Sequence, residues 1–312
     1  MTTGAPTATG AGRGRHVDEA TPPIDVPLVR RLLDAQFPQW ADRPLDALAW
    51  SGTDNAIFRL GDDLSVRLPR SARLEAVAAR EHRWLRRFAP LLPLEIPVPV
   101  ALGRPNEDFP WPWSIHRWIE GEHGRLAGDH GAAAPLGAFV AALGTLDPGG
   151  GNRPGPDNVF RGAPLEHRDH WVQGALPRLG DRGLAERIGA VWRDALAEPG
   201  WDRTGVWLHG DLHDGNLLLR DGRLAAVIDF GCMAVGDPAC DLMVAWNLPG
   251  PADRAVFRSS LPHVDDATWR RGRAWALAVW TVGLVGRVGP LAASARHVIA
   301  QVLDDVDGRT TL

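Results

Sequence analysis

The sequence predicts an α+β protein of two lobes, a small β-rich N-terminal lobe and a larger, mainly helical C-terminal lobe. Its 312 residues are enough for two lobes that each bury a core of their own. The first third of the chain shows patterns typical of short strands around a charged helix, whereas helical patterns dominate after Glu120. We therefore expect a disordered tail over residues 1–23, an N-terminal lobe over 24–120 and a C-terminal lobe over 121–312.

The elements of the N-terminal lobe follow from local patterns. Order begins with a helix over 26–37, where apolar residues recur at helical spacing. The run IFRLGDDLSVRL alternates apolar and polar residues around a Gly-Asp turn, which is typical of a hairpin. A charged helix is expected over 73–88. The expected strands of this lobe lie at 46–51, 56–60, 64–68, 96–102 and 113–119.

The C-terminal lobe shows helical patterns separated by irregular segments. A Gly/Pro-rich loop over 147–157 interrupts them, and so does the stretch WLHGDLHDGNLLLRDGRLAAVIDFG at 207–231. Because ligands tend to bind in clefts between lobes, we expect the functional site where the two lobes meet. The expected helices lie at 132–146, 183–197, 267–288 and 291–306.

The composition indicates a soluble globular protein. Hydrophobic residues make up 45% of the chain and charged residues 23%, which are ordinary fractions for this class. The net charge of -4 argues against a nucleic-acid partner, for which a basic patch is the usual signature. There is no lysine, so all 34 basic residues are arginine, and an arginine can occupy a position where related chemistry uses lysine.

The sequence predicts neither export nor a membrane partner. The N-terminal segment lacks the apolar core of a secretory signal. The most apolar later stretch, AWALAVWTVGLVG at 274–286, is too short to span a bilayer. The two cysteines, Cys232 and Cys240, match neither a disulfide framework nor a metal-site spacing. We therefore expect a cytoplasmic location, where thiols stay reduced.

Polar residues surround short apolar strands in the stretch at 207–231. Two strands around the turn Asp221-Gly222 predict a hairpin. A hairpin places the start of its first strand beside the end of its second, so we expect Asn216 and Asp229 to be neighbours at its open end. Paired strands lie about 5 Å apart, close enough for both side chains to hold one cation or a close pair. An amide oxygen and a carboxylate, with room left for phosphate oxygens, suit Mg²⁺.

Asp211 lies on the loop just before this hairpin and would face the same point without being needed as a metal ligand. This position favours a general base. Kinase-type phosphoryl transfer uses this set of residues, because one Asp accepts the proton of the substrate hydroxyl while an Asn and a second Asp hold the magnesium ions.

The motif His209-x-Asp211-x-x-x-x-Asn216 with the later Asp229-Phe230-Gly231 resembles the aminoglycoside phosphotransferase family of small-molecule antibiotic kinases. It is less similar to the HRD loop of protein kinases. The segment GDPACDL at 236–242 matches the GDPxxDL segment of that family. The resemblance extends from about residue 25 onward and is most specific between 207 and 246. It implies a bilobal protein-kinase-like fold.

The resemblance implies nucleotide contacts in the N-terminal lobe. Ser51, Gly52 and Thr53 occupy the turn that covers the nucleotide phosphates in a kinase lobe, where backbone amides and hydroxyls can donate to phosphate oxygens. Arg67 stands where the family usually has a strand lysine, and Glu81 is the helix carboxylate that would pair with it. An arginine is a planar fork and not a point charge, so this is a departure from the family.

The segment SIHRWIE at 114–120 should cross between the lobes, and its backbone could contact the purine edge. Trp118 within it is either a neighbour of the nucleotide or part of the core. The roles that the resemblance implies for Asp237 and Asp241, after the magnesium-binding segment, are structural, such as helix capping.

The expected function is that of a small-molecule O-phosphotransferase. It would move the γ-phosphoryl group of magnesium-bound ATP or GTP to a hydroxyl of an aminoglycoside-like antibiotic, and so confer antibiotic resistance. A macrolide kinase or another metabolite kinase of the same family is an alternative. A catalytically silent nucleotide-binding protein is a further alternative, motivated by Arg67. A protein kinase is disfavoured because no APE-like motif follows the DFG segment.

The acceptor pocket should be formed by segments of the second lobe that include 160–175 and 262–275. Tryptophans, 14 in number, could suit an apolar macrolide or fill the core. The carboxylates that could meet a polycationic aminoglycoside, or equally stay solvated, are Glu166, Asp169, Asp265 and Asp266.

Overall fold

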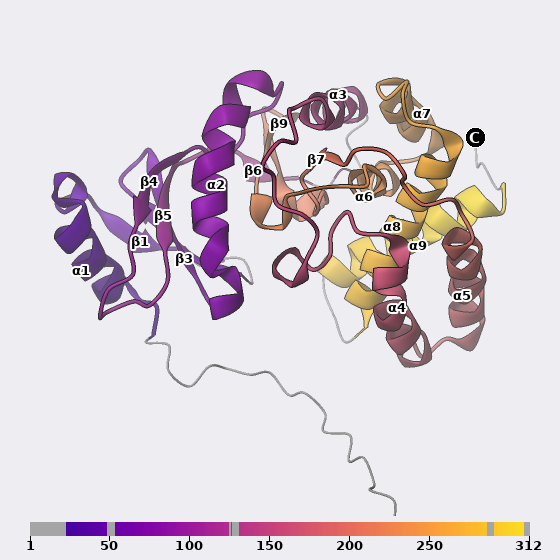
Figure 1. Ribbon diagram of the computed structural model, residues 1–312, viewed down its shortest axis with the longest axis horizontal. Helices are drawn as coiled ribbons and strands as arrows, with labels where there is room; N and C mark the ends of the chain where they lie inside the picture. Colours follow the sequence, from indigo (N-terminus) through magenta and orange to yellow (C-terminus); the bar gives the residue numbers. More distant parts are fainter. Residues whose placement is uncertain (1–22, 49–53, 125, 127–130, 286–289, 309–312) are drawn as a thin grey trace, which may run out of the picture.

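The protein is described here by a computed structural model that covers residues 23–48, 54–124, 126, 131–285 and 290–308. Nearly all of the tail expected over 1–23 lies outside these residues. The described chain forms a small β-rich N-terminal lobe and a larger helical lobe, which confirms the predicted fold class (Figure 1).

The N-terminal lobe is built on an antiparallel sheet of five strands in the order β1-β2-β3-β5-β4. The predicted hairpin is β2–β3, which pairs in register from Asn55↔Pro69 to Leu60↔Leu64. The predicted first strand is shorter than expected, and residues 49–51 of it lie outside the described part of the chain. The strands are β1 (Leu45–Ala47), β2 (Asn55–Leu60), β3 (Leu64–Pro69), β4 (Pro99–Gly103) and β5 (Trp113–Arg117).

The strand predicted over 96–102 begins at Pro99, and the chain just before it connects the lobes. Glu95 forms a parallel bridge with Ala226 of the C-terminal hairpin. Its N–H donates to the carbonyl of Ala225 at 3.0 Å, and its own carbonyl accepts from Val227 at 2.9 Å. The chain therefore leaves one sheet at Glu95 and enters the other at Pro99.

Two helices flank the N-terminal sheet and bury different faces. Helix α1 (Val26–Gln36) buries Leu28 and Leu32 in the core of the N-terminal lobe. Helix α2 (Glu75–Phe88) instead buries Trp84 and Phe88 in the large core that it shares with the C-terminal lobe. Accordingly, α2 stands between the N-terminal sheet and the rest of the molecule (Figure 1).

The C-terminal lobe contains the four helices that periodicity predicts and further short ones that it misses. Its longest helix, α8, buries most of its residues and is packed against α9, α6 and α5. The helices are α3 (Ala133–Gly144), α4 (Asp169–Ala175), α5 (Arg182–Leu196), α6 (Ala239–Leu242), α7 (Pro251–Ser259), α8 (Asp266–Leu284) and α9 (Pro290–Val306). Within the described residues no helix is both long and apolar enough to cross a membrane.

The C-terminal lobe also contains two small antiparallel sheets. One has the order β6-β8-β9 and the other pairs β10 with β7. Asp221 and Gly222 have φ of 52° and 71°, as a two-residue hairpin turn requires, so the predicted hairpin is confirmed. The strands are β6 (Glu122–His123), β7 (Val206–Leu208), β8 (Leu217–Arg220), β9 (Arg223–Val227) and β10 (Ala234–Gly236).

Candidate active site

A cavity of about 170 Å³ lies between the lobes and collects four of the predicted site residues. Arg67 and Trp118 reach it from the N-terminal lobe, and Asn216 and Asp229 reach it from the C-terminal hairpin. Its apolar walls include Leu48, Ile57, Leu218 and Ile228. An apolar slot with a few convergent polar groups at one end is typical of a site for a small polar ligand.

The segment between β5 and β6 lines this cavity as it passes between the lobes. The Arg117 and Trp118 N–H groups donate to Val98 and Asp63 at 2.9 and 2.8 Å, so they are used within the N-terminal lobe. Ile119 follows on the cavity wall, and its backbone takes part in none of the described hydrogen bonds. The Trp118 ring is half-buried against the cavity, with the Arg59 guanidinium 4.0 Å from its centre.

The hairpin brings Asn216 and Asp229 together at its open end, as the sequence predicts. Leu217 pairs with Val227, and the next rung is the hydrogen bond from Ile228 N to the Asn216 carbonyl at 2.9 Å. Asp229 then turns through a left-handed conformation with φ of 66°, which is costly for a residue other than glycine. This strained turn aims its carboxylate into the cavity.

Asn216 and Asp229 fit the requirements of a magnesium site shared with phosphates. The Asn216 amide nitrogen donates to the Asp211 carbonyl at 2.8 Å, and its oxygen accepts none of the described hydrogen bonds. Desolvation raises the pKa of Asp229 although its side chain opens onto the cleft, since protein atoms surround it. Among the described residues no group of three or more His, Cys, Asp or Glu side chains is arranged to hold a metal ion, so a cation here would need ligands from phosphate oxygens as well.

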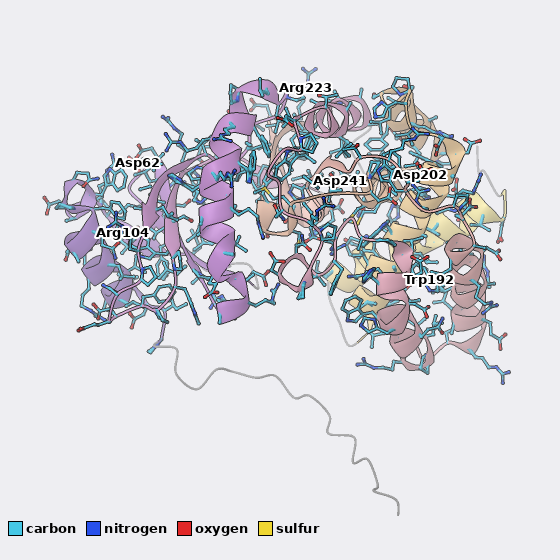
Figure 2. All side chains as sticks on the ribbon, viewed as in Figure 1. Asp62, Arg104, Trp192, Asp202, Arg223 and Asp241 are labelled. Carbon is cyan, nitrogen blue, oxygen red and sulfur yellow. The ribbon has the colours of Figure 1, made fainter. Side chains whose placement is uncertain are left out.

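Buried polar groups hold the loop that carries Asp211 in place. The N–H groups of His209 and Gly210 each donate to the Asp241 carboxylate at 2.7 Å. His209 accepts from the Asp211 N–H at 3.1 Å and contacts the Ile228 carbonyl at 3.0 Å, while burial lowers its pKa to about 4. His209 is therefore neutral and braces the loop. Figure 2 labels Asp241, which lies in the interior of the C-terminal lobe.

Asp211 has a basic side chain beside each carboxylate oxygen. Arg161 donates from Nη2 to Oδ1 at 2.7 Å, and the His213 Nε2 lies 3.6 Å from Oδ2. Burial by itself would raise the pKa of Asp211, but the charge of Arg161 and the hydrogen bond from His213 outweigh it and hold this pKa well below its usual range. Asp211 is therefore a carboxylate at any physiological pH.

Comparisons with known proteins agree with this geometry. The sequence matches the phosphotransferase enzyme family over residues 47–275. The chain belongs to that family. It is thus a phosphotransferase with a protein-kinase-like architecture, which confirms the predicted family and enzyme class. A comparison with curated protein sequences finds no match.

Solved structures of other phosphotransferases share the fold. A complex of APH(2″)-IIIa with GDP and kanamycin is 19% identical, with 91% of this chain and 99% of that chain covered and a TM-score of 0.66. The streptomycin–ATP complex of APH(2″)-IIa is 19% identical over 81% of this chain and 86% of that one, with a TM-score of 0.53. The macrolide 2′-phosphotransferase MphH from Brachybacterium faecium is 25% identical over 87% and 98%, with a TM-score of 0.55.

In this phosphotransferase the predicted Arg67–Glu81 ion pair is not among the described contacts. Glu81 is buried and lies 3.7 Å from His116 Nε2, which also contacts the Ser114 hydroxyl at 2.9 Å. Burial raises the pKa of Glu81 to about 7, and the nearby Arg67 offsets part of that rise. Arg67 is left with a buried Nε that has no described partner, at the wall of the cavity.

Other site predictions fall outside what the structure describes or have different neighbours than expected. Ser51, Gly52 and Thr53 lie outside the described residues; Asp54, directly after them, lines the cavity. Arg161 was missed as a site residue. The sequence shows only that this arginine lies in the segment 160–175, and no spacing rule relates it to Asp211.

The carboxylates predicted for a polycationic acceptor are mostly engaged elsewhere. Asp169 accepts from Trp192 Nε1 at 2.8 Å, and Asp265 caps helix α8 by accepting from Thr268 N at 2.8 Å. Asp266 pairs with Arg258. Glu166 lines a separate groove together with the loop that precedes β7.

Proposed function

We propose that this phosphotransferase moves the γ-phosphoryl group of a magnesium-bound nucleoside triphosphate to a hydroxyl of a small molecule. The observation that carries the proposal is the convergence of Arg67, Asn216 and Asp229 on one cavity, with the Asp211 loop bonded to Asn216 beside it. Catalysis of this kind depends on placement and charge neutralisation more than on covalent chemistry. Residues 24–120 would then bind the nucleotide, and residues 121–312 would supply the base and the acceptor pocket.

Asp211 is the group that accepts the acceptor hydroxyl proton. As the hydroxyl oxygen forms its bond to the γ-phosphorus, the bond from that phosphorus to the β–γ bridging oxygen breaks, and the nucleoside diphosphate leaves. A carboxylate that is always ionised is ready for this step at neutral pH.

Asn216 and Asp229 are the residues that would hold Mg²⁺, which supplies neutralisation of the phosphate charge when it is bound. Arg67, with its unpartnered buried Nε, and the turn at Ser51–Thr53 would hold the phosphate oxygens. Trp118 and the backbone after it would flank the purine. ATP and GTP are both candidate donors, since APH(2″)-IIa and APH(2″)-IIIa are solved with ATP and GDP respectively.

An antibiotic of the aminoglycoside type is the acceptor that the family resemblance suggests. One observation favours the alternative of a macrolide-like acceptor with little positive charge. Asp169, Asp265 and Asp266 are engaged in a tryptophan contact, a helix cap and an ion pair. Asp211 is bordered by Arg161 and by His213, whose ring packs against Trp280. A polycation gains little from such surroundings. The cytoplasm, where nucleoside triphosphates are made, is the proposed location.

The test is an Asp211→Asn variant beside the wild-type protein. We expect kcat for phosphoryl transfer to fall by roughly 10²–10⁴-fold, because the amide cannot take the proton. Nucleotide affinity, followed by calorimetry with ATP and GTP in the presence of Mg²⁺, should change little. A loss of nucleotide affinity as large as the loss of rate would contradict the assigned role.

The acceptor is identified by mass spectrometry of aminoglycosides, macrolides and sugar-like metabolites incubated with the enzyme, Mg²⁺ and ATP or GTP. A mass increase of one phosphate, absent with Asp211→Asn, identifies the acceptor. Phosphorylation of macrolides but not of aminoglycosides would support the charge argument above, and the reverse would overturn it. Nucleotide binding without transfer to any compound would favour the catalytically silent alternative.

A further inference from the structure

Arg161 is the one buried cation that the described contacts join to the side chain of Asp211. Only 9% of its side chain is exposed, against 25% for Asp211, and the two are 50 residues apart in sequence. Taking a guanidinium out of water is costly unless its donors are satisfied. Here Nη2 has the carboxylate, Nη1 has only the Met243 sulfur at 3.8 Å, and Nε has no described partner.

The loop before Arg161 holds a conformation that presents this side chain. Val159 and Phe160 both have positive φ, 54° and 55°, which is strained for a β-branched and for an aromatic residue. Arg168 donates to the Val159 carbonyl at 2.9 Å, and Asn158 accepts from Gly155 N at 2.8 Å. Strain that the surroundings maintain in this way is found where a side chain must be placed accurately.

The loop is also tied to the nucleotide-binding lobe and to the metal-binding segment. Arg80 of α2 donates to the Asp157 carboxylate and, at 2.8 Å, to the Gly231 carbonyl two residues after Asp229. The position of Arg161 therefore depends on elements that contact the nucleotide side of the cleft.

We propose that Arg161 is a positioning residue for phosphoryl transfer, which fixes Oδ1 of Asp211 so that Oδ2, whose described neighbour is the His213 Nε2 at 3.6 Å, can take the acceptor proton. The proposal rests on the proposed function of Asp211. Arg161 itself stays protonated throughout, since the proton goes from the acceptor hydroxyl to Asp211 and the phosphoryl group goes from the nucleotide to the acceptor oxygen. A fixed carboxylate keeps one oxygen lone pair directed at the acceptor hydroxyl. We therefore expect the contact to raise kcat and to leave nucleotide affinity unchanged.

The experiment compares Arg161→Gln and Arg161→Lys with the wild-type protein, using the acceptor identified above. We expect Arg161→Gln to lower kcat by about 100-fold, a typical loss for a misplaced catalytic base, with nucleotide Kd close to wild type. Arg161→Lys keeps the positive charge but cannot donate to several neighbours in one plane, so its kcat should fall less than that of Arg161→Gln. In an Arg161→Ala variant, added guanidinium should restore part of the lost kcat and leave KM for the nucleotide unchanged.

The matched control is Arg254→Gln. Arg254 on α7 is also a buried arginine paired with an aspartate, since its Nη2 lies 3.8 Å from Asp305 and the two side chains are 6% and 27% exposed. It should lower Tm as the Arg161 variants do, but leave kcat of the folded protein near wild type and show no guanidinium rescue. Thermal melting and nucleotide binding identify the variants that fold, and Arg161→Lys carries the test if the others do not.

Wild-type kcat in Arg161→Gln or Arg161→Lys would overturn the proposal, and so would a loss that guanidinium does not restore and Arg254→Gln reproduces. Asp211→Asn is measured in parallel. If that variant still transfers phosphate at the wild-type rate, the proposed function of Asp211 has failed; if it is inactive while the Arg161 variants are fully active, only the role of Arg161 has failed.

Discussion

Burial and neighbouring side chains together determine the protonation state of the polar residues around the cleft. Asp211 keeps its charge because the Arg161 guanidinium and the His213 side chain offset its desolvation. Among the described contacts no cation is hydrogen-bonded to Glu81, so burial raises its pKa to about 7, while its neighbour His116 is kept neutral by the same burial. Side chains of similar chemistry therefore differ in charge because their partners differ.

Replacing Glu81 by Gln should change how stability depends on pH. A carboxyl with a raised folded-state pKa stabilises the fold fully below its ordinary pKa of 4.5, and this contribution is lost as pH rises through about 7. The stability of Glu81→Gln relative to wild type should therefore increase between pH 4.5 and pH 7 and stay constant above it. Urea unfolding at a series of pH values measures this, and a pH-independent difference would contradict it.

Arg67→Lys tests the departure from the family pattern. Lysine is the residue that the family usually has at this position, so the variant should retain nucleotide binding and transfer within about tenfold of wild type, whereas Arg67→Ala should weaken both. Calorimetry with ATP and Mg²⁺, together with steady-state rates, separates the two variants. Equal behaviour of Arg67→Ala and wild type would exclude a phosphate contact.

At the scale of elements, the loop from His209 to Asp211 depends on a glycine. Gly210 has φ of +86°, and a Cβ there would come within 2.5 Å of the Cys232 carbonyl. The preceding and following residues are fixed by Asp241 and His209, so the loop cannot relax without moving Asp211. The glycine thus keeps the base in place.

Gly210→Ala should lower the free energy of unfolding by roughly 1–3 kcal/mol and reduce kcat further than stability alone explains. Gly174→Ala is the control, because this glycine lies in α4 with open space where its Cβ would be. That substitution should be neutral or stabilise by up to about 1 kcal/mol, since alanine favours helix. Denaturant unfolding and transfer assays compare the two; equal effects would show that Gly210 has no special constraint.

At the scale of the whole molecule, α2 joins the two lobes. It carries Glu81 toward the N-terminal strands and Trp84 into the C-terminal core, where the Trp84 and Trp207 rings are 4.7 Å apart. Arg80, on the same helix, bridges to Asp157 and Gly231. Helix α2 therefore holds the two lobes together through side chains on its C-terminal-lobe face, beside the backbone bridge at Glu95.

A double-mutant cycle between Arg80→Ala and Asp157→Ala should give a coupling free energy of roughly 1 kcal/mol, because the arginine side chain is largely buried. The exposed pair Arg182–Glu186 on α5 serves as the control, with side chains 92% and 66% exposed. Solvent-exposed i,i+4 pairs contribute about 0.3–0.5 kcal/mol. Unfolding experiments on both cycles test the difference, and equal coupling would mean that the bridge between the lobes has no added strength.

The sequence by itself determined the features that depend on local order along the chain. The hairpin around Asp221-Gly222 brings Asn216 beside Asp229 because the two residues are connected through a single tight turn. The long helices follow from apolar periodicity for the same local reason. The motif around Asp211 indicated the family, which the comparison over residues 47–275 confirms.

Only the tertiary structure decided which distant residues meet. Arg161 reaches Asp211 across 50 residues, and the described contact of Glu81 is with His116 rather than Arg67. Three of the four carboxylates expected near the acceptor are engaged in other contacts. Such pairings depend on how separate elements pack, and a side chain's charge follows from the neighbours and burial that this packing gives it. No local pattern carries that information, because the same short segment can pack against many different partners.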